Sequence, residues 1–183
     1  MDRRRFLVSM SAGITASSAL FSSLQSVQAA VTAAPPTIAG LTPAQWDLVA
    51  LIQEHLLPTE ADSPGAQTIH ARRYLQSVLN EPRHDPGDRR FLLQGLTDLD
   101  ALAVKRYRHR FFTLDHGQRE TLLREYERSR DGHRWLRMLL DYLMEALLTD
   151  PVYGGNPQGV GWKWLRHTPG FPRPPAPQGP LFA

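Results

Sequence analysis

The chain has no cysteine among its 183 residues. It can therefore form no disulfide framework, offer no CxxCH attachment site for haem c, and hold no iron–sulfur cluster through thiolates. Lysine is also scarce, since only Lys105 and Lys163 occur among 21 basic residues. The missing cysteines exclude several redox cofactors as ligands of this chain.

The sequence also lacks the short motifs that accompany common enzyme chemistries. Neither GxSxG nor SxxK occurs, which argues against a serine hydrolase. Gly154 and Gly159 have the separation of a phosphate-binding loop, but Val160 stands where that loop needs lysine. Trp164 replaces the third glycine of a dinucleotide fingerprint. HExxH is absent, and the one ExxH, Glu81–His84, falls in a Pro-containing breaker rather than on facing helices. We expect no catalytic, cofactor or metal site in this chain.

The N-terminus contains an arginine cluster, within the sequence DRRRFLV. Arg3 and Arg4, followed one residue later by Phe6 and Leu7, match the pattern of a twin-arginine export signal. The apolar stretch that follows, residues 8–24, is diluted with serine and is too polar for a membrane span of about 20 apolar residues. Residues 1–34 are therefore interpreted as a signal peptide and linker rather than as part of the fold.

Two fates are open for this leader. It could be cleaved after the small-residue stretch Val27–Ala29 or a few residues later near Ala34, or it could be retained as an uncleaved anchor. Without the leader, 18 basic and 17 acidic residues remain, and such a near-neutral chain gives no reason to expect nucleic-acid binding. The twin-arginine route carries folded cargo, so we expect a protein that assembles with a cofactor or a partner before export.

The rest of the chain predicts an all-α bundle of about five amphipathic helices within residues 35–150. No stretch sustains a period of two, so no strand is expected. Thr42–Gln45 combines an N-cap threonine, a proline at the first helical position and a capping-box glutamine, which predicts a helix running to Leu57. Apolar residues at helical spacing predict four more helices, which begin at Ser63–Pro64, near Asp85–Pro86 (reaching Phe112), at Asp115 and around Trp135.

The strongest charge run is Lys105–Arg110, which reads KRYRHR. One interpretation is the solvated C-terminal end of a helix, where cations complement the helix dipole. The other is a docking site for an acidic partner. Trp135, Met138 and Tyr142 recur at helical spacing, which indicates core packing rather than a cofactor site.

The composition changes after Leu148. Residues 151–183 are rich in glycine and proline but contain aromatic side chains, which would bury large apolar areas if they lay on another surface. We interpret this segment as an irregular arm that wraps a partner. Its most informative part, PVYGGNPQGVGW at residues 151–162, could be only a helix stop and turn, because glycines supply positive φ angles. Alternatively, its glycines could admit a partner between aromatic anchors.

These segments together resemble the gluconate 2-dehydrogenase subunit 3 family. The resemblance is carried by the twin-arginine leader, the helix LTPAQWDLVALIQEHLLP, the SPGA loop and the terminal DPVYGGNPQGVGW, of which the last is the most specific. It covers the leader and nearly all of residues 41–172. The chain departs from the family late, because it reads WKWLRHTPG at residues 162–170 where members commonly continue into a GYPG-like stretch.

The resemblance implies a non-catalytic small subunit of a periplasmic sugar or sugar-acid dehydrogenase. It implies a large flavoprotein partner of the glucose-methanol-choline type that holds FAD and the catalytic residues, and commonly a third subunit, a multihaem cytochrome c. It also implies that this chain carries the signal read by the twin-arginine translocase for both proteins, towards the outer face of the inner membrane. Gluconate, glucose and sorbitol all remain open as substrates. The residues that we expect to dock the partner are Tyr153, Gly154, Gly155, Asn156, Gly161 and Trp162.

A second hypothesis belongs to a different class. The chain could be a stand-alone periplasmic helical protein that binds a small ligand between its helices, and it would then keep its binding activity when purified alone. A third hypothesis, an independent enzyme, is disfavoured by the missing motifs.

Overall fold

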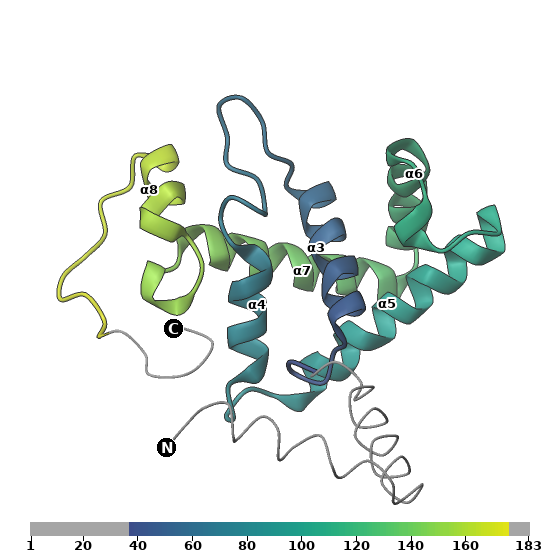
Figure 1. The fold of residues 1–183 in the computed structure, drawn as a ribbon, viewed down its shortest axis with the longest axis horizontal. Coiled ribbons are helices and arrows are strands. Elements are labelled where there is room, and N and C mark those ends of the chain that lie inside the picture. The colour runs from purple at the N-terminus through teal and green to yellow at the C-terminus, as the bar shows by residue number, and fades with distance from the viewer. Residues whose placement is uncertain (1–36, 176–183) are drawn as a thin grey trace, which may run out of the picture. The chain divides into compact units, whose positions relative to one another are not determined.

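The computed structural model describes residues 37–175 (Figure 1). Its α-helices are α3 (Pro43–Leu56), α4 (Ala71–Asn80), α5 (Pro86–Tyr107), α6 (His116–Glu127), α7 (Arg130–Leu148) and α8 (Val160–Leu165). Short 3₁₀ turns are η2 (Phe111–Thr113), η3 (Pro151–Tyr153) and η4 (Pro157–Gly159). No strand occurs between residues 37 and 175, where Ile38 and Leu41 form an isolated β-bridge. The predicted all-α class is confirmed. The proposed export signal, with Arg3, Arg4, Phe6 and Leu7, lies outside the described residues.

The other helices are arranged around α7, which passes behind α3 and α4 in Figure 1. Its buried residues recur at helical spacing and face α3, α4, α5 and α6. Trp135 is fully buried at the centre and donates its indole N–H to the carbonyl oxygen of Leu92 on α5 at 3.2 Å. A Cβ on Gly95 would overlap this indole, so the glycine sets how closely α5 approaches α7. Trp135 and Tyr142 belong to the core, as predicted.

Helix starts follow the capping residues that the sequence offers. The Oγ1 atom of Thr42 accepts the backbone N–H of Gln45 at 3.3 Å, and the Gln45 side chain accepts the Thr42 N–H at 2.8 Å. Asp115 and Gln118 form the same reciprocal pair at the start of α6. Because each pair satisfies two otherwise unpaired backbone donors, the predicted starts of α3 and α6 are confirmed.

The predicted start of the second helix is wrong. Helix α4 begins at Ala71 rather than at Ser63–Pro64. The carboxylate of Glu54 accepts the backbone N–H groups of Thr59 and Gln67 at 3.0 and 2.9 Å, and the Ala66 N–H bonds the Leu57 carbonyl at 2.8 Å. These bonds hold the SPGA stretch as a loop folded against the end of α3. Glu54, which precedes the loop on α3, thus holds the loop in a conformation other than the helix that the capping signal at Ser63 predicts.

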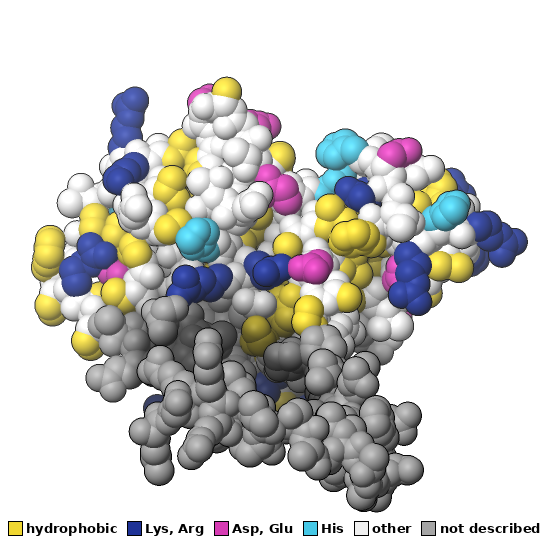
Figure 2. Space-filling model, viewed as in Figure 1, with side chains coloured by type: hydrophobic (Ala, Val, Ile, Leu, Met, Phe, Trp, Pro, Cys, Tyr) yellow, Lys and Arg dark blue, Asp and Glu magenta, His cyan; other side chains and the backbone are white. Residues whose placement is uncertain are grey.

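The third helix ends earlier than predicted. Helix α5 stops at Tyr107, because Arg108 adopts a left-handed conformation with a φ of 63°. Phe111 then turns inward, fully buried, with its N–H donated to Asp100 at 2.9 Å, whereas Phe112 points outward and is 55% exposed. The KRYRHR run therefore lies across a helix end and the following turn, and Figure 2 shows Lys and Arg side chains gathered over that end of the molecule.

Candidate functional site

Asn156 is the centre of the GGNP segment and is fully buried. Its backbone N–H donates to the carbonyl oxygen of Ile69 in the SPGA-containing loop at 2.9 Å. Its side-chain Nδ2 donates to the Thr149 carbonyl after α7 at 2.9 Å, and its Oδ1 accepts the Gly161 N–H of α8 at 2.7 Å. Asn156 therefore joins the end of α7 and the start of α8 to a loop 87 positions earlier in the sequence, and its side-chain amide is satisfied at both ends.

Two glycines of the segment lie directly on the backbone of α7. A Cβ at Gly155 would press on the carbonyl oxygen of Ala146, and one at Gly161 would overlap that of Leu147. Gly154 has a different role, because its φ of 90° is one that side chains rarely tolerate. The glycines thus allow the chain to reverse after α7 and pack back on it.

Trp162 closes this arrangement from the other side. Its indole N–H donates to the Leu148 carbonyl oxygen at 2.7 Å, and the guanidinium of Arg173 lies 4.8 Å from the ring centroid. Arg173 also pairs with Asp150 at 2.5 Å, and this hydrogen bond lowers the pKa of the Asp150 carboxyl below its ordinary value. Through Arg173, residues 166–173 therefore pack back against Asp150 and Trp162.

The six predicted docking residues thus occupy two kinds of position. Gly155, Asn156, Gly161 and Trp162 are buried in contacts within the chain, and Gly154 is half-buried. Tyr153 is held through its backbone carbonyl, which accepts the Ser77 hydroxyl at 3.1 Å, while its ring is exposed. The structure brings all six together beside the end of α7. Docking of a partner on them stays a prediction.

Sequence reasoning missed one apolar surface next to this segment. Leu140, Met144 and Leu148 on α7, with Trp164 and Leu165 on α8, are each between 40% and 48% exposed. Leu140, Met144 and Leu148 follow one another at intervals of four residues, so they form a second apolar stripe on α7 beside the buried one. That spacing is visible in the sequence, but only the fold shows which stripe the other helices cover. The short helix α8 was also missed, because the glycines around it hide any period.

A family model described as gluconate 2-dehydrogenase subunit 3 matches residues 43–170. The match begins at the first residue of α3, includes the GGNP segment and α8, and ends within residues 166–173. This chain belongs to that family. No curated protein and no solved structure matches it significantly. The family's description names a subunit of a dehydrogenase, so the chain is grouped with the accessory subunits of oxidoreductase complexes. None of the helices in residues 37–175 is long and apolar enough to cross a membrane.

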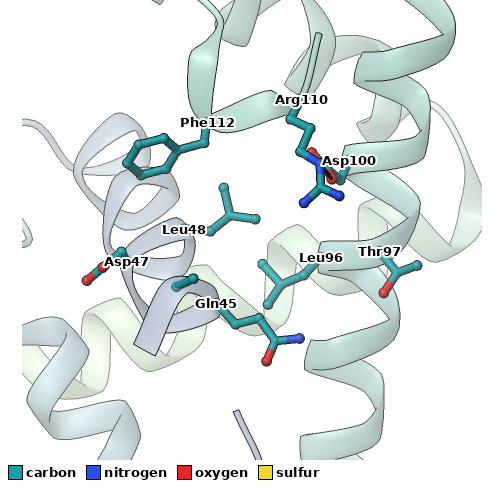
Figure 3. Close-up of a pocket in the computed structure, with 9 residues that line it drawn as sticks. Gln45, Asp47, Leu48, Leu96, Thr97, Asp100, Arg110 and Phe112 are labelled. Atoms are coloured by element: carbon teal, nitrogen blue, oxygen red, sulfur yellow. Dashed lines mark ion pairs between the residues drawn. The ribbon is translucent and has the colours of Figure 1, made fainter. Parts of the chain in front are cut away.

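This subunit 3 chain also has an open groove of about 370 Å³ between α3 and α5 (Figure 3). Leu48 and Leu96 form its apolar floor, and the exposed ring of Phe112 stands at one side. Arg110 and Asp100 lie together at the other side, 3.7 Å apart. Gln45, Asp47 and Thr97 also line the groove, so its lining combines an apolar floor with polar and charged side chains.

Two tyrosine hydroxyls of this family member donate to carboxylates at partly buried positions. The Tyr142 hydroxyl donates to Asp88 at 3.0 Å, and the Tyr74 hydroxyl donates to Glu145 at 3.0 Å. Burial, followed by the neighbouring carboxylate, raises the pKa of both phenols, so they remain protonated donors at neutral pH. Among the described residues, no three His, Asp or Glu side chains are placed to hold a metal ion.

Proposed function

We propose that this chain is the non-catalytic small subunit of a periplasmic, FAD-dependent sugar or sugar-acid dehydrogenase such as gluconate 2-dehydrogenase. In this role it escorts the flavoprotein subunit through twin-arginine export and stabilises it. The observation that carries the proposal is the match to subunit 3 over residues 43–170. FAD and the catalytic residues would belong to a large partner of the glucose-methanol-choline type, and a multihaem cytochrome c would be the third subunit.

The ionisable groups with clearly shifted pKa values are ones that hold contacts within the fold. A general base works best with a pKa near the operating pH. The groups with clear shifts move away from that range instead: burial raises the pKa of Tyr126 to about 12 and raises those of Tyr74 and Tyr142 further. Hydrogen bonds from His55 and Arg173 lower the pKa values of Glu120 and Asp150 respectively. These shifts fix charge states that hold ion pairs and hydrogen bonds in the fold.

The escort role requires both an export signal and a surface that binds the partner. A twin-arginine signal on this chain serves a flavoprotein only if the two proteins remain bound during transport, because a dissociated partner would stay behind. A small subunit of this kind therefore needs a durable contact surface. The exposed side chains on α7 and α8 supply apolar area for one.

The test exchanges the paired arginines in the native host. Full-length chain carrying Arg3→Lys and Arg4→Lys should move dye-linked sugar dehydrogenase activity from the periplasm to the cytoplasm. The matched control is Arg5→Lys, which changes the neighbouring position between the pair and Phe6 and should leave the activity periplasmic. Tagged wild-type chain should copurify with a larger polypeptide that shows a flavin absorption spectrum. Unchanged periplasmic activity of the double variant would contradict export by this chain, and absence of flavin would contradict the partnership.

The groove beside α3 gives a second candidate, a stand-alone protein that binds a small ligand. Its floor of Leu48 and Leu96 suits an apolar moiety, and Gln45 and Thr97 are polar groups at its edge. Thermal unfolding of the purified chain in the presence of small molecules that carry both an apolar moiety and hydroxyl groups decides between the two. A concentration-dependent rise in Tm would favour ligand binding, whereas an unchanged Tm leaves the subunit role.

A further inference from the structure

Helix α7 presents an apolar stripe on the side that the other helices leave uncovered. Leu140, Met144 and Leu148 are four residues apart, so their side chains lie one above the other along about 12 Å of the helix. Trp135, Tyr142 and Ala146 lie on the opposite side of α7 and are packed against the bundle. One helix therefore contributes both to the core and to an exposed apolar strip.

The strip continues onto α8. Gly161 packs on Leu147 and the Trp162 indole bonds the Leu148 carbonyl, which places α8 at the C-terminal end of α7. Trp164 and Leu165 follow Gly161 by three and four residues and are 43% and 45% exposed, so α8 adds two exposed apolar side chains near the end of α7. We call Leu140, Met144, Leu148, Trp164 and Leu165 the α7–α8 surface.

The charges that α8 and the residue after it add beside this surface are of one sign. Lys163 and Arg166 are exposed on and just after α8, and neither forms an ion pair within the part of the chain that the structure describes. Residues 151–175 contain no aspartate or glutamate, and the preceding Asp150 is already bound to Arg173. A matching surface would therefore have an apolar centre and carboxylates opposite these two cations.

We propose that the α7–α8 surface is the docking site for the catalytic subunit of the dehydrogenase, with carboxylates of that subunit facing Lys163 and Arg166. The inference rests on the proposed function and assigns it to a place. It also gives the GGNP segment a defined part. Asn156, Gly155 and Gly161 act as positioning residues that hold α8 against α7, while the partner touches the side chains exposed beside them.

Two other occupants fit the surface less well. A membrane-lying face carries Lys and Arg beside its apolar residues, but here an exposed carboxylate, Asp141, adjoins Leu140 and pairs with Arg137 at 2.9 Å. That pair would lose its hydration on a lipid surface. A second copy of this chain offers few free carboxylates to Lys163 and Arg166, because its Asp141 already pairs with Arg137 and its residues 151–175 contain none.

The experiment places a charge at the centre of the surface. Tagged full-length chain with Met144→Glu replaces the wild type in the native host, and flavin is measured per tagged chain after purification. Because glutamate is a good helix former, the substitution should leave α7 intact, which circular dichroism and Tm check. The matched control is Val104→Glu on α5, at a side chain that is 42% exposed. We expect Met144→Glu to lower the flavin ratio at least tenfold and Val104→Glu to leave it unchanged.

A second variant tests the charges. Lys163→Glu with Arg166→Glu should lower the flavin ratio less, and the remaining complex should no longer weaken as salt is raised, since its attractive charges are gone. A wild-type ratio in both surface variants overturns the proposal. If Phe112→Glu instead removes flavin, the small-subunit function stands and docking belongs at the groove beside α3. If tagged wild-type chain carries no flavin, the proposed function fails as well.

The other occupants are tested on the same variants. Wild-type chain is tested for sedimentation with phosphatidylglycerol vesicles and for dimer formation in sedimentation velocity. The proposal is overturned if Met144→Glu abolishes either association but leaves the flavin ratio at the wild-type level. Monomeric wild-type chain that ignores the vesicles and loses flavin only with the surface variants supports it.

Discussion

The helices α3 to α7 and the segment from Pro151 to Arg173 are ordered by different interactions. In the bundle, apolar side chains at helical spacing bury one another, with Trp135 and Leu139 at the centre. In the C-terminal segment, the main contacts are hydrogen bonds to backbone carbonyls, made by Asn156 and Trp162, together with glycines that admit close approach. A segment without a periodic apolar face can therefore still adopt one defined conformation when the C-terminal end of a neighbouring helix supplies carbonyl groups as hydrogen-bond acceptors.

The largest expected effect is on the free energy of unfolding, when one tryptophan is removed from each of the two regions in turn. Trp135→Ala removes a fully buried ring and should lower the free energy of unfolding by about 3–5 kcal/mol. Trp164→Ala, on the exposed side of α8, should change it by less than about 0.5 kcal/mol. Urea unfolding followed by far-UV circular dichroism measures both. Equal losses would show that α8 is as much a part of the core as α7.

A smaller and more local effect is expected at Asn156. Asn156→Gly tolerates the φ of 48° but removes both side-chain hydrogen bonds, so the Thr149 carbonyl and the Gly161 N–H lose their partners. Each buried group left unpaired costs about 1–3 kcal/mol. Hydrogen exchange should speed up in residues 151–165 and stay unchanged in α5.

The matched control for this variant is Asn80→Gly, which removes an exposed asparagine at the end of α4. It should leave exchange in residues 151–165 unchanged. If Asn156→Gly accelerated exchange throughout the bundle, the C-terminal segment would unfold together with α3 to α7, and the two regions would not be separable.

The smallest effect concerns pH. The pKa of Asp150 is lower in the folded chain because Arg173 donates to it. The contact therefore stabilises the folded segment at pH values above the unfolded pKa of about 3.9, and this contribution is lost as the pH falls through the folded value. Since Arg173 lies over Trp162, tryptophan fluorescence should change in this acid range. Asp150→Asn should remove the change, and Asp141→Asn, in the exposed pair on α7, should retain it.

The sequence predicted those parts of the fold that depend on near neighbours. The starts of α3 and α6 could be predicted because each capping pair lies within four residues. The start of α4 could not, since Glu54 binds backbone groups of a loop up to 13 residues away and so competes with the capping signal at Ser63. The end of α5 was missed for a similar reason, as Asp100 draws the Phe111 N–H into a turn.

The sequence could predict that the six residues of the candidate site lie near one another, but it could not predict which of them are buried. The residues of the GGNP segment do lie together, yet burial separates Tyr153 from Asn156 and Trp162. The sequence cannot show that separation, because it depends on α7 carbonyls that the segment meets only after folding. The exposed stripe at Leu140, Met144 and Leu148 has the spacing of a core face, and its exposure follows from where the other helices pack.

The bond from the Asn156 N–H to Ile69 has a consequence for building chimeras between members of the family. The loop between α3 and α4 and the segment after α7 meet at one residue, although more than 80 positions of sequence separate them. A transplanted C-terminal segment must meet the loop of its new host at the same backbone position, because this bond joins two backbone atoms and no side chain can extend to restore it. Exchanging the two stretches together would preserve that position.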